Sequence, residues 1–525
     1  MKRFLSVLLI IMVFTVFLAG CGGSSKTATS EKTFKIGFLP LDTRPCCLDI
    51  PLELADISGV EVLAPNREDL TQFKDEADTD FAKNWLKENA KSCDALVISM
   101  EQLVYGGLIQ SRNGSKDTAS RDGALELLKN LKKDRPDVPI YLSNVLMRTY
   151  TSVFNQEDLV WWEKINEFSK AYYKAEILKD KDAQKEVSKL KEEIPTNVLD
   201  TFLNVRAVNH ELNMTCINLV NEGVIDRLVI CQEDCNEGGI QSVEQIELTT
   251  EINRLNLKEK VSVANGTDEA GAELIMYAVN PSGCSLSVCW LGDNADFTAS
   301  YEDRKFKENL SEHCGFMNIS IDENSENVVC ILPPKKLQGD YATGDFKNHE
   351  AYSNQEIIDM CDKVKKLTDE GKRCYILDLD CANGGTAEFV SCLGQTMDIK
   401  NIYGYSGWNT ASNSLGTLLA QIVATNGKNS DLNKVYTAER ILDEVVYQSV
   451  VRPIMYKKAE SMTENETGEK VNIFGLKNLD EKERWLQDEF LAQDKLIKNI
   501  FKDSLPEYRA ELRWPRLFEI SVKCN

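Results

Sequence analysis

A recurring unit constrains the fold of this chain most strongly: an apolar run, then polar or glycine residues, then helical periodicity. The apolar runs have the length and β-branched content of buried strands, whereas the segments between them repeat with the period of an α-helix. The pattern occurs at residues 34–41, 95–100, 139–146, 226–232, 261–265, 286–291, 327–333, 373–379 and 401–406. Buried strands that alternate with helices predict a parallel sheet covered by helices.

Two α/β architectures fit this pattern. A (β/α)8-like barrel with insertions is the one we favour, and two consecutive doubly wound domains divided near residue 280 are the alternative. We expect the α/β catalytic-type domain to span residues 34–426, with a charged helical insertion near 155–194. The strand pattern then stops, so residues 427–525 are expected to form a helical C-terminal part.

The N-terminus is typical of a lipoprotein. A basic start and a long apolar run end in LAGC, which predicts a signal peptide over residues 1–20 and a lipid on Cys21. An ordinary signal peptide or an N-terminal anchor is the alternative. Residues 21–33 are expected to be a flexible tether. We therefore expect the protein to be lipid-anchored in the cell membrane and exposed outside the cytoplasm.

Charge and cysteine content narrow the possible partners. A net charge of −22 argues against a nucleic-acid partner. The 16 cysteines lack the paired CxxC spacing of a zinc site, and the three histidines are scattered. We expect no cofactor and no histidine-rich metal site. An oxygen-free habitat or several disulfides would account for so many thiols in an exported protein.

Polar residues follow most of the expected strands, and the carboxyl ends of parallel strands converge on one crevice. Asp42 and Arg44 can also pair with each other, and Trp408 can belong to the core. These strand-end motifs supply a set of candidate substrate-binding residues: Asp42, Arg44, Glu101, Tyr105, Arg112, Arg148, Asp378, Asn383, Trp408 and Asn409.

Two motifs contain adjacent acids, QEDCNEGG (232–239) and GTDEAG (266–271). Such acids can cap a helix or stabilise its first turn, so a local role is one interpretation. The other is chemical, because glycoside hydrolysis needs one carboxyl group with a raised pKa and a second as base or nucleophile. On that interpretation the candidate catalytic residues are Glu233, Asp234, Asp268 and Glu269.

The segment 196–220 carries a polar stripe at helical spacing. Its members are Arg206, Asn209, His210 and Asn213, where a solvent-facing helix would usually have Lys and Glu. The stripe can face a ligand or form buried hydrogen bonds, and both interpretations stay open. Arg206, Asn209 and His210 join the candidate substrate-binding residues.

Seven motifs in order, PLDTRP, LVYGGLIQSR, RAVNHELN, QEDCNEGG, GTDEAG, DLDCANGG and YSGWNTASNSLG, resemble the DUF4127 proteins, a bacterial family of unknown function. Thr43 and Cys47 stand where the family pattern has Asp and Asn, and Glu101 and Glu233 where it has Asp. The acids at 101 and 233 are therefore kept, whereas the one at 43 is lost, so Thr43 is not expected to be catalytic. The resemblance implies a shared pocket and supplies no reaction.

Together these features predict a hydrolase that acts on carbohydrate, with an oligosaccharide or another small molecule as its ligand. The sequence has no GxxxxGK[ST], HExxH or GxSxG motif. One alternative is a metal-assisted hydrolase such as a phosphoesterase, with Mg²⁺, Mn²⁺ or Ca²⁺ bound by Asp42, Glu233, Asp234, Asp268 and Asp378. The other is a lipid-anchored solute-binding protein.

Overall fold

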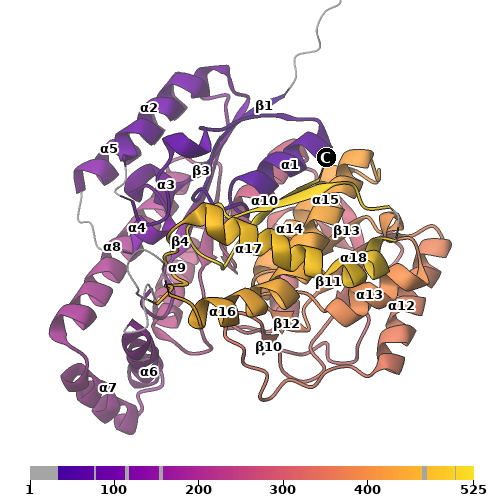
Figure 1. Cartoon of the computed structure of the whole chain (residues 1–525). Coiled ribbons are helices and arrows are strands. Elements are labelled where there is room, and N and C mark those ends of the chain that lie inside the picture. Colours follow the sequence, from indigo (N-terminus) through magenta and orange to yellow (C-terminus); the bar gives the residue numbers. More distant parts are fainter. Residues whose placement is uncertain are drawn as a thin grey trace, which may run out of the picture. The chain divides into compact units, whose positions relative to one another are not determined.

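Two parallel β-sheets with open edges form the framework of the protein (Figure 1). The computed structural model describes residues 34–75, 78–112, 118–152, 158–463, 470–502 and 504–524. The predictions for residues 1–33, namely the signal peptide, the lipid on Cys21 and the tether, lie outside the described residues.

Six strands form the first sheet in the order β2-β1-β3-β4-β5-β6, and five form the second in the order β13-β11-β9-β7-β8. The strands of the first sheet are β1 (Lys35–Leu39), β2 (Glu61–Leu63), β3 (Ala95–Ser99), β4 (Ile140–Leu146), β5 (Arg227–Gln232) and β6 (Val261–Asn265). Those of the second are β7 (Ser285–Trp290), β8 (Ser320–Ile321), β9 (Asn327–Leu332), β11 (Arg373–Asp378) and β13 (Gly404–Ser406). The strand order reverses beside β1 and again beside β7, which gives each sheet the switch point of a doubly wound fold.

Helices connect the strands. Those before residue 280 are α1 (Asp49–Ser58), α2 (Thr79–Asn89), α3 (Met100–Tyr105), α4 (Leu108–Ser111), α5 (Thr118–Asp134), α6 (Asp158–Glu176), α7 (Lys181–Glu193), α8 (Thr196–Asn221), α9 (Ile240–Arg254) and α10 (Ala270–Val279). Those between the later strands are α11 (Phe306–Phe316), α12 (Asn354–Asp369), α13 (Ala387–Thr396) and α14 (Ala411–Thr425). Short strands β10 (Gly339–Asp340) and β12 (Cys381–Ala382) pair with each other near the end of β11.

The predicted α/β class with parallel strands is confirmed, and each of the nine expected segments contains a strand. The strands form two open sheets, as in the doubly wound alternative. They do not close into the single barrel that we favoured from the sequence. The reason lies in β2 and β8, which pair on the outer side of the first strand of their sheet. A barrel needs each new strand to be added in the same direction, and these two short strands reverse it.

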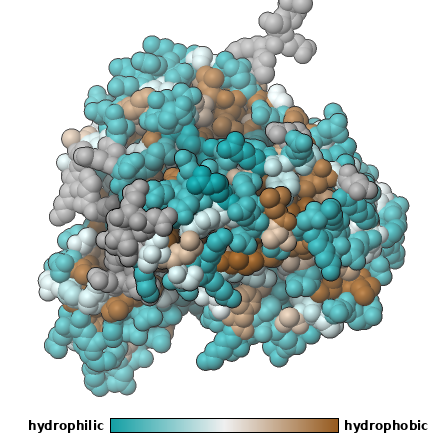
Figure 2. Space-filling view, in the orientation of Figure 1, coloured by the Kyte–Doolittle hydropathy of each residue, from teal (hydrophilic) through white to brown (hydrophobic). Residues whose placement is uncertain are grey.

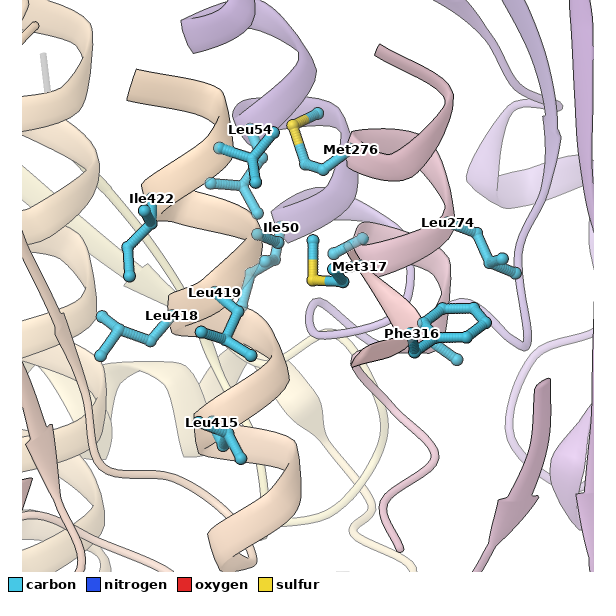
Figure 3. Close-up of a cluster of buried hydrophobic side chains, with 14 of the residues drawn as sticks. Ile50, Leu54, Leu274, Met276, Phe316, Met317, Leu415, Leu418, Leu419 and Ile422 are labelled. Carbon is cyan, nitrogen blue, oxygen red and sulfur yellow. The ribbon is translucent and has the colours of Figure 1, made fainter. Parts of the chain in front are cut away.

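A junction of three helices lies between the sheets (Figure 3). Helices α1, α10 and α14 pack against one another there. Their buried apolar side chains include Ile50, Leu54, Leu274, Met276, Leu415 and Leu419. The same core cluster contains Phe38 of β1 and Leu377 of β11. The two sheets therefore share one hydrophobic core, and residues 34–525 form one compact unit.

The C-terminal region is helical, as predicted. It contains α15 (Asp431–Ile441), a π-helix η4 (Leu442–Val451), α16 (Arg452–Glu460), α17 (Leu479–Ala492) and α18 (Asp494–Phe501). It ends in an antiparallel pair that the sequence analysis did not expect, β14 (Tyr508–Glu511) and β15 (Ser521–Cys524). Between these strands, the Trp514 indole N–H donates to the Thr43 hydroxyl oxygen at 2.8 Å. The last residues thus contact the loop that follows β1.

Hydrophilic residues cover most of the face shown in Figure 2, while the larger apolar clusters are internal. Among the described helices, none combines the length and the apolar content that a membrane crossing requires. The cysteines from Cys46 to Cys524 are all free thiols, and most are buried. The described cysteines therefore do not form the disulfides that the sequence analysis offered as one explanation.

Candidate functional site

A buried ion-pair cluster joins the loop after β1 to the loop after β6. The Arg44 guanidinium donates to both carboxylate oxygens of Asp268 at 2.9 and 2.7 Å, and to Asp42 at 2.9 Å. These three residues are at most 6 % exposed. Burial lowers the pKa of Arg44, but the charges of Asp268 and Asp42 outweigh it and raise that pKa well above its usual range. The local pairing of Asp42 with Arg44 exists, and Asp268 extends it across the sheet.

The interpretation of GTDEAG as a side-chain helix cap is wrong. Helix α10 begins at Ala270, and no side chain accepts a capping hydrogen bond there. Asp268 uses both oxygens on Arg44, while Glu269 Oε2 accepts from the Thr267 N–H at 2.8 Å. A guanidinium forms stronger, charge-assisted hydrogen bonds than a free backbone N–H group, which explains why Asp268 turns away from the helix.

Glu269 lies beside a buried histidine. His313 Nδ1 is 2.7 Å from Glu273 Oε1, and its Nε2 donates to the Asn265 carbonyl oxygen at 2.9 Å. Burial raises the pKa of Glu269 to about 8. Burial lowers the pKa of His313, but Glu273 and Glu269 more than offset it, and the result is a pKa of about 9. Both shifts favour the protonated forms, so Glu269 and His313 bind their protons more tightly here than free side chains do.

A second ion-pair cluster follows β5. Arg148 donates to Glu233 at 2.7 Å and to Asp234 at 2.5 Å, and Arg112 donates to Glu233 from its other side. The Glu233 side chain is 4 % exposed, whereas that of Asp234 is 27 % exposed. Helix α9 has Gly239 at its N-cap position, so neither acid caps it. Of the four predicted catalytic acids, Asp234 is the one with an accessible carboxylate.

The two clusters lie within electrostatic range of each other. Burial and then the like charge of Arg148 lower the pKa of Arg112 well below its usual range, and Arg44 acts in the same direction. The charges of Asp234 and Asp268 oppose this shift. The carboxyl ends of β1, β4, β5 and β6 therefore converge on one charged region.

A chain of hydrogen bonds extends from this region to the second sheet. Asn413 accepts from the Thr267 N–H at 2.9 Å and donates to the Asn409 side chain at 2.6 Å. The Asn383 N–H donates to the Asn409 carbonyl oxygen at 2.7 Å. These contacts cross from the loop after β6 to the loops after β13 and β11.

The chain ends at a tyrosine–aspartate pair. Asn383 Nδ2 donates to Asp340 Oδ1 at 3.0 Å, and the Tyr301 hydroxyl donates to Asp340 Oδ2. Tyr301 in turn lies against the loop after β5, since its carbonyl oxygen accepts from the Cys235 N–H at 2.9 Å. We call the connected set the inter-sheet strip, and it comprises Arg44, Asp268, Asn413, Asn409, Asn383, Asp340 and Tyr301.

The polar stripe of α8 supports the second ion-pair cluster, that of Arg112, Arg148, Glu233 and Asp234. Arg206 donates to the Met147 carbonyl oxygen at 2.9 Å and to Glu244 at 2.7 Å. Asn209 donates to the Ser111 carbonyl oxygen at 3.0 Å. These backbone groups belong to the segments that carry Arg148 and Arg112, so the stripe holds the arginines in place. His210 instead pairs with Glu247 at the outer side of α8.

Other candidates lie apart from the strip. Glu101 accepts from the Ser99 hydroxyl and the Val145 N–H inside the first sheet, and burial raises its pKa to about 7. Tyr105 lies in a hydrophobic group behind the same sheet. Asp378 is fully buried and accepts from Thr386 and Tyr405. Trp408 belongs to the core and is 7 % exposed, as the alternative to its substrate-binding role had it.

Tyr301 and Asp340 were not among the residues predicted from the sequence. They follow β7 and β9, in the segments LGDNADFTASYED (291–303) and QGDYATGD (338–345). The density of Asp and Gly in these segments is the signal that could have identified them. Their partners, Asp234 and Asn383, are distant in sequence, so only the fold brings the four residues together.

Three groups of side chains in the described part of the chain combine residue types that bind metals. They are Cys46 with Cys47 and Asp268, Glu269 with Glu273 and His313, and His349 with Asp380 and Cys381. The all-oxygen set proposed from the sequence is not among them. Arginines donate hydrogen bonds to four of its members, Asp42, Asp268, Glu233 and Asp234. These carboxylates are therefore already paired with a cation other than a metal ion.

Comparison with known proteins gives the family and nothing beyond it. No curated protein matches the chain. No solved structure matches it either. A family model described as "Protein of unknown function (DUF4127)" matches residues 36–523, which include every residue of the strip. The chain therefore belongs to the DUF4127 family.

Proposed function

We propose that the protein is a hydrolase acting on carbohydrate, with its substrate bound along the inter-sheet strip. One observation carries the proposal: Tyr301 contacts the loop after β5, where Asp234 lies, and also Asp340 in β10. Tyr301 donates to Asp340, and after burial the charges of Asp340 and Asp234 are among the causes that raise its pKa. Two carboxyl groups that approach from opposite sides suit cleavage of a glycosidic bond.

The rest of the strip supports a sugar as the ligand. Sugar hydroxyl groups both donate and accept hydrogen bonds, and amide, carboxylate and guanidinium groups satisfy both roles. Asn409 and Tyr301 of the strip are partly exposed, and so is Arg148, which pairs with Asp234. Arg148 donates to Asp234 and also to Glu233, which fixes the direction of the Asp234 carboxylate, and this is the positioning that a catalytic carboxylate needs.

The test uses the full chain and a panel of aryl glycosides and oligosaccharides. Asp234→Asn and Asp340→Asn should each lower turnover by roughly 10²–10⁴-fold at temperatures where both variants remain folded, because each amide keeps the shape and removes the proton chemistry. The limb of the pH–rate profile that each variant loses identifies the acid and the base. The matched control is Asp345→Asn, an exposed acid on the same loop as Asp340. Full turnover in both site variants would refute the proposal.

A second candidate is a solute-binding protein, which the two open sheets favour. In that case the chain binds a sugar through the strip but cleaves no member of the panel. The shared core argues for the hydrolase, because helices α1, α10 and α14 join the two sheets into one packed unit. Isothermal titration and turnover, measured on the same sugars, separate the two candidates.

We further propose that the protein is a lipoprotein, anchored in the cell membrane through Cys21 and exposed outside the cytoplasm. The support is the LAGC sequence after an apolar run, followed at once by polar residues. Cys21→Ala should release the protein from the membrane fraction or leave it unprocessed, as followed by fractionation and mass. A variant that matures and fractionates like wild type would contradict the lipid anchor.

A further inference from the structure

A mixed group of possible metal ligands lies at the carboxyl end of β11, outside the contacts assigned to cleavage. His349 Nε2 is 3.1 Å from both carboxylate oxygens of Asp380. The Cys381 sulfur is 3.7 Å from the same nitrogen and 3.9 Å from Asp380 Oδ2. One nitrogen, one oxygen and one sulfur thus form a triangle.

The dimensions of the triangle match one face of a zinc tetrahedron. Zinc–ligand bonds of about 2.0–2.3 Å at tetrahedral angles separate neighbouring ligand atoms by roughly 3.3–3.6 Å. The three observed separations differ from these values by a few tenths of an ångström. We propose that His349, Asp380 and Cys381 bind Zn²⁺, with the fourth position open to water or to another ligand.

The local fold brings these residues together from two segments. Cys381 in β12 pairs with Gly339 in β10, and a loop then returns the chain so that Leu337 bridges to His349. A Cβ atom at Gly339 would lie 3.1 Å from the Cys381 sulfur and 2.5 Å from Phe346. The glycine therefore leaves the space in which the sulfur and the loop lie.

The other two mixed groups are less suited to a metal. At Cys46, Cys47 and Asp268, the Arg44 guanidinium already binds both carboxylate oxygens and contacts the Cys47 sulfur. A metal there would face a fixed positive charge.

The group of Glu269, Glu273 and His313 is at most 3 % exposed, and both nitrogens of His313 have partners. The His349 group differs in having a partly exposed member, since the His349 side chain is 10 % exposed. A metal can therefore reach His349 from solvent.

Zinc would also change the state of the thiol. Coordination stabilises the thiolate, and the thiol proton leaves as the metal binds. The bound metal would tie the segment that carries Asp340 to β12.

Cobalt titration of the metal-stripped full chain tests the site, because Co²⁺ substitutes for Zn²⁺ and is coloured. The wild type should take up one Co²⁺ per chain, with a thiolate-to-cobalt charge-transfer band and the intense visible bands of tetrahedral cobalt. One equivalent of Zn²⁺ should abolish both. If the wild type shows no charge-transfer band, His349 and Asp380 form a plain ion pair and the proposal is wrong. No variant is needed for that conclusion.

Variants assign the ligands. Cys381→Ser should remove the charge-transfer band, and His349→Gln should weaken Zn²⁺ binding by more than the roughly 10–100-fold that loss of a residue orienting a ligand costs. The control is Cys392→Ser, a half-buried thiol outside the group. Retention of the band in Cys381→Ser, or equal loss in Cys392→Ser, contradicts the assignment. The optical readout requires no substrate, so it is independent of the proposed hydrolase.

Discussion

At the scale of single residues, the candidate site is built from buried charges that satisfy one another. Asp42, Arg44 and Asp268 are the clearest case, since the guanidinium has carboxylates on two sides and little solvent. Removal of one partner from a buried pair is costly because the other charge stays buried. The acids of GTDEAG are thus part of a network, and the helix start depends on their backbone alone.

Asp268→Asn tests this account of GTDEAG. The amide removes the charge opposite Arg44, and we expect a loss of about 3 kcal/mol in the free energy of unfolding, measured with urea. A capping role would predict much less, because Asn caps a helix about as well as Asp. Asp137→Asn, in an exposed pair with Arg135, serves as the control and should change little. Equal stability of both variants would return Asp268 to a local role.

A pH dependence follows from the group around His313. Glu269 and His313 both bind their protons more tightly in the folded chain, with pKa values of about 8 and about 9. The folded state therefore holds more protons than the unfolded state, and stability should fall as pH rises from about 4.5 to about 9, with Glu269 contributing up to about pH 8 and His313 from about pH 6.5. The Glu269→Gln variant lacks the Glu269 carboxyl group and the extra proton that it binds in the folded state. Its melting temperature should therefore fall less than that of the wild type over that pH range.

The control for the pH experiment is Glu237→Gln, at an exposed position in the loop after β5. It should follow the wild-type melting curve at every pH. If Glu269→Gln also runs parallel to wild type, Glu269 does not hold a proton that the unfolded chain lacks.

At the scale of elements, the contact between α10 and α14 explains how the two sheets are joined so closely. Gly416 in α14 faces Glu269 and Glu273, and a Cβ atom there would lie 2.3 Å from Glu269 Cγ and 2.7 Å from Glu273 Oε1. The missing side chain lets the two helices approach. The helix that carries Asn413 is therefore seated directly on the acids that follow β6.

Two glycine-to-alanine substitutions separate the effect of this close helix contact on stability from the effect of helix propensity. Alanine is the better helix former, so Gly123→Ala in α5, with nothing within 4 Å, should stabilise the protein by about 0.5–1 kcal/mol. Gly416→Ala should destabilise it by about 1–3 kcal/mol, because overpacking outweighs propensity. Thermal unfolding of both variants gives the comparison. A stabilised Gly416→Ala would mean that the two helices do not meet as described.

At the scale of the whole molecule, the strands were predictable and their order was not. Most of the nine predicted strands are buried and contain β-branched residues, which gives them a clear pattern. β2 and β8 are short and carry exposed residues, so they leave almost no signal, yet they decide that the sheets are open. The helical C-terminal region was evident because its strand pattern stops.

The candidate site likewise contains residues that were predictable from the sequence and residues that were not. Asp42, Arg44, Glu233, Asp234 and Asp268 follow their strands directly, and that position alone suggested them. Tyr301 and Asp340 lie farther along the loops and become candidates only because the second sheet turns its strand ends toward Asp234. Long-range placement of that kind depends on the sheet order, which the local pattern does not contain.

We propose that the inter-sheet strip binds carbohydrate, and a crystal structure of Asp234→Asn soaked with a sugar that wild type cleaves would show where the sugar lies. We expect the sugar to contact Asn409, Tyr301 and Arg148, with its glycosidic oxygen between residues 234 and 340. A sugar bound elsewhere, with the strip still closed on its own hydrogen bonds, would contradict the claim.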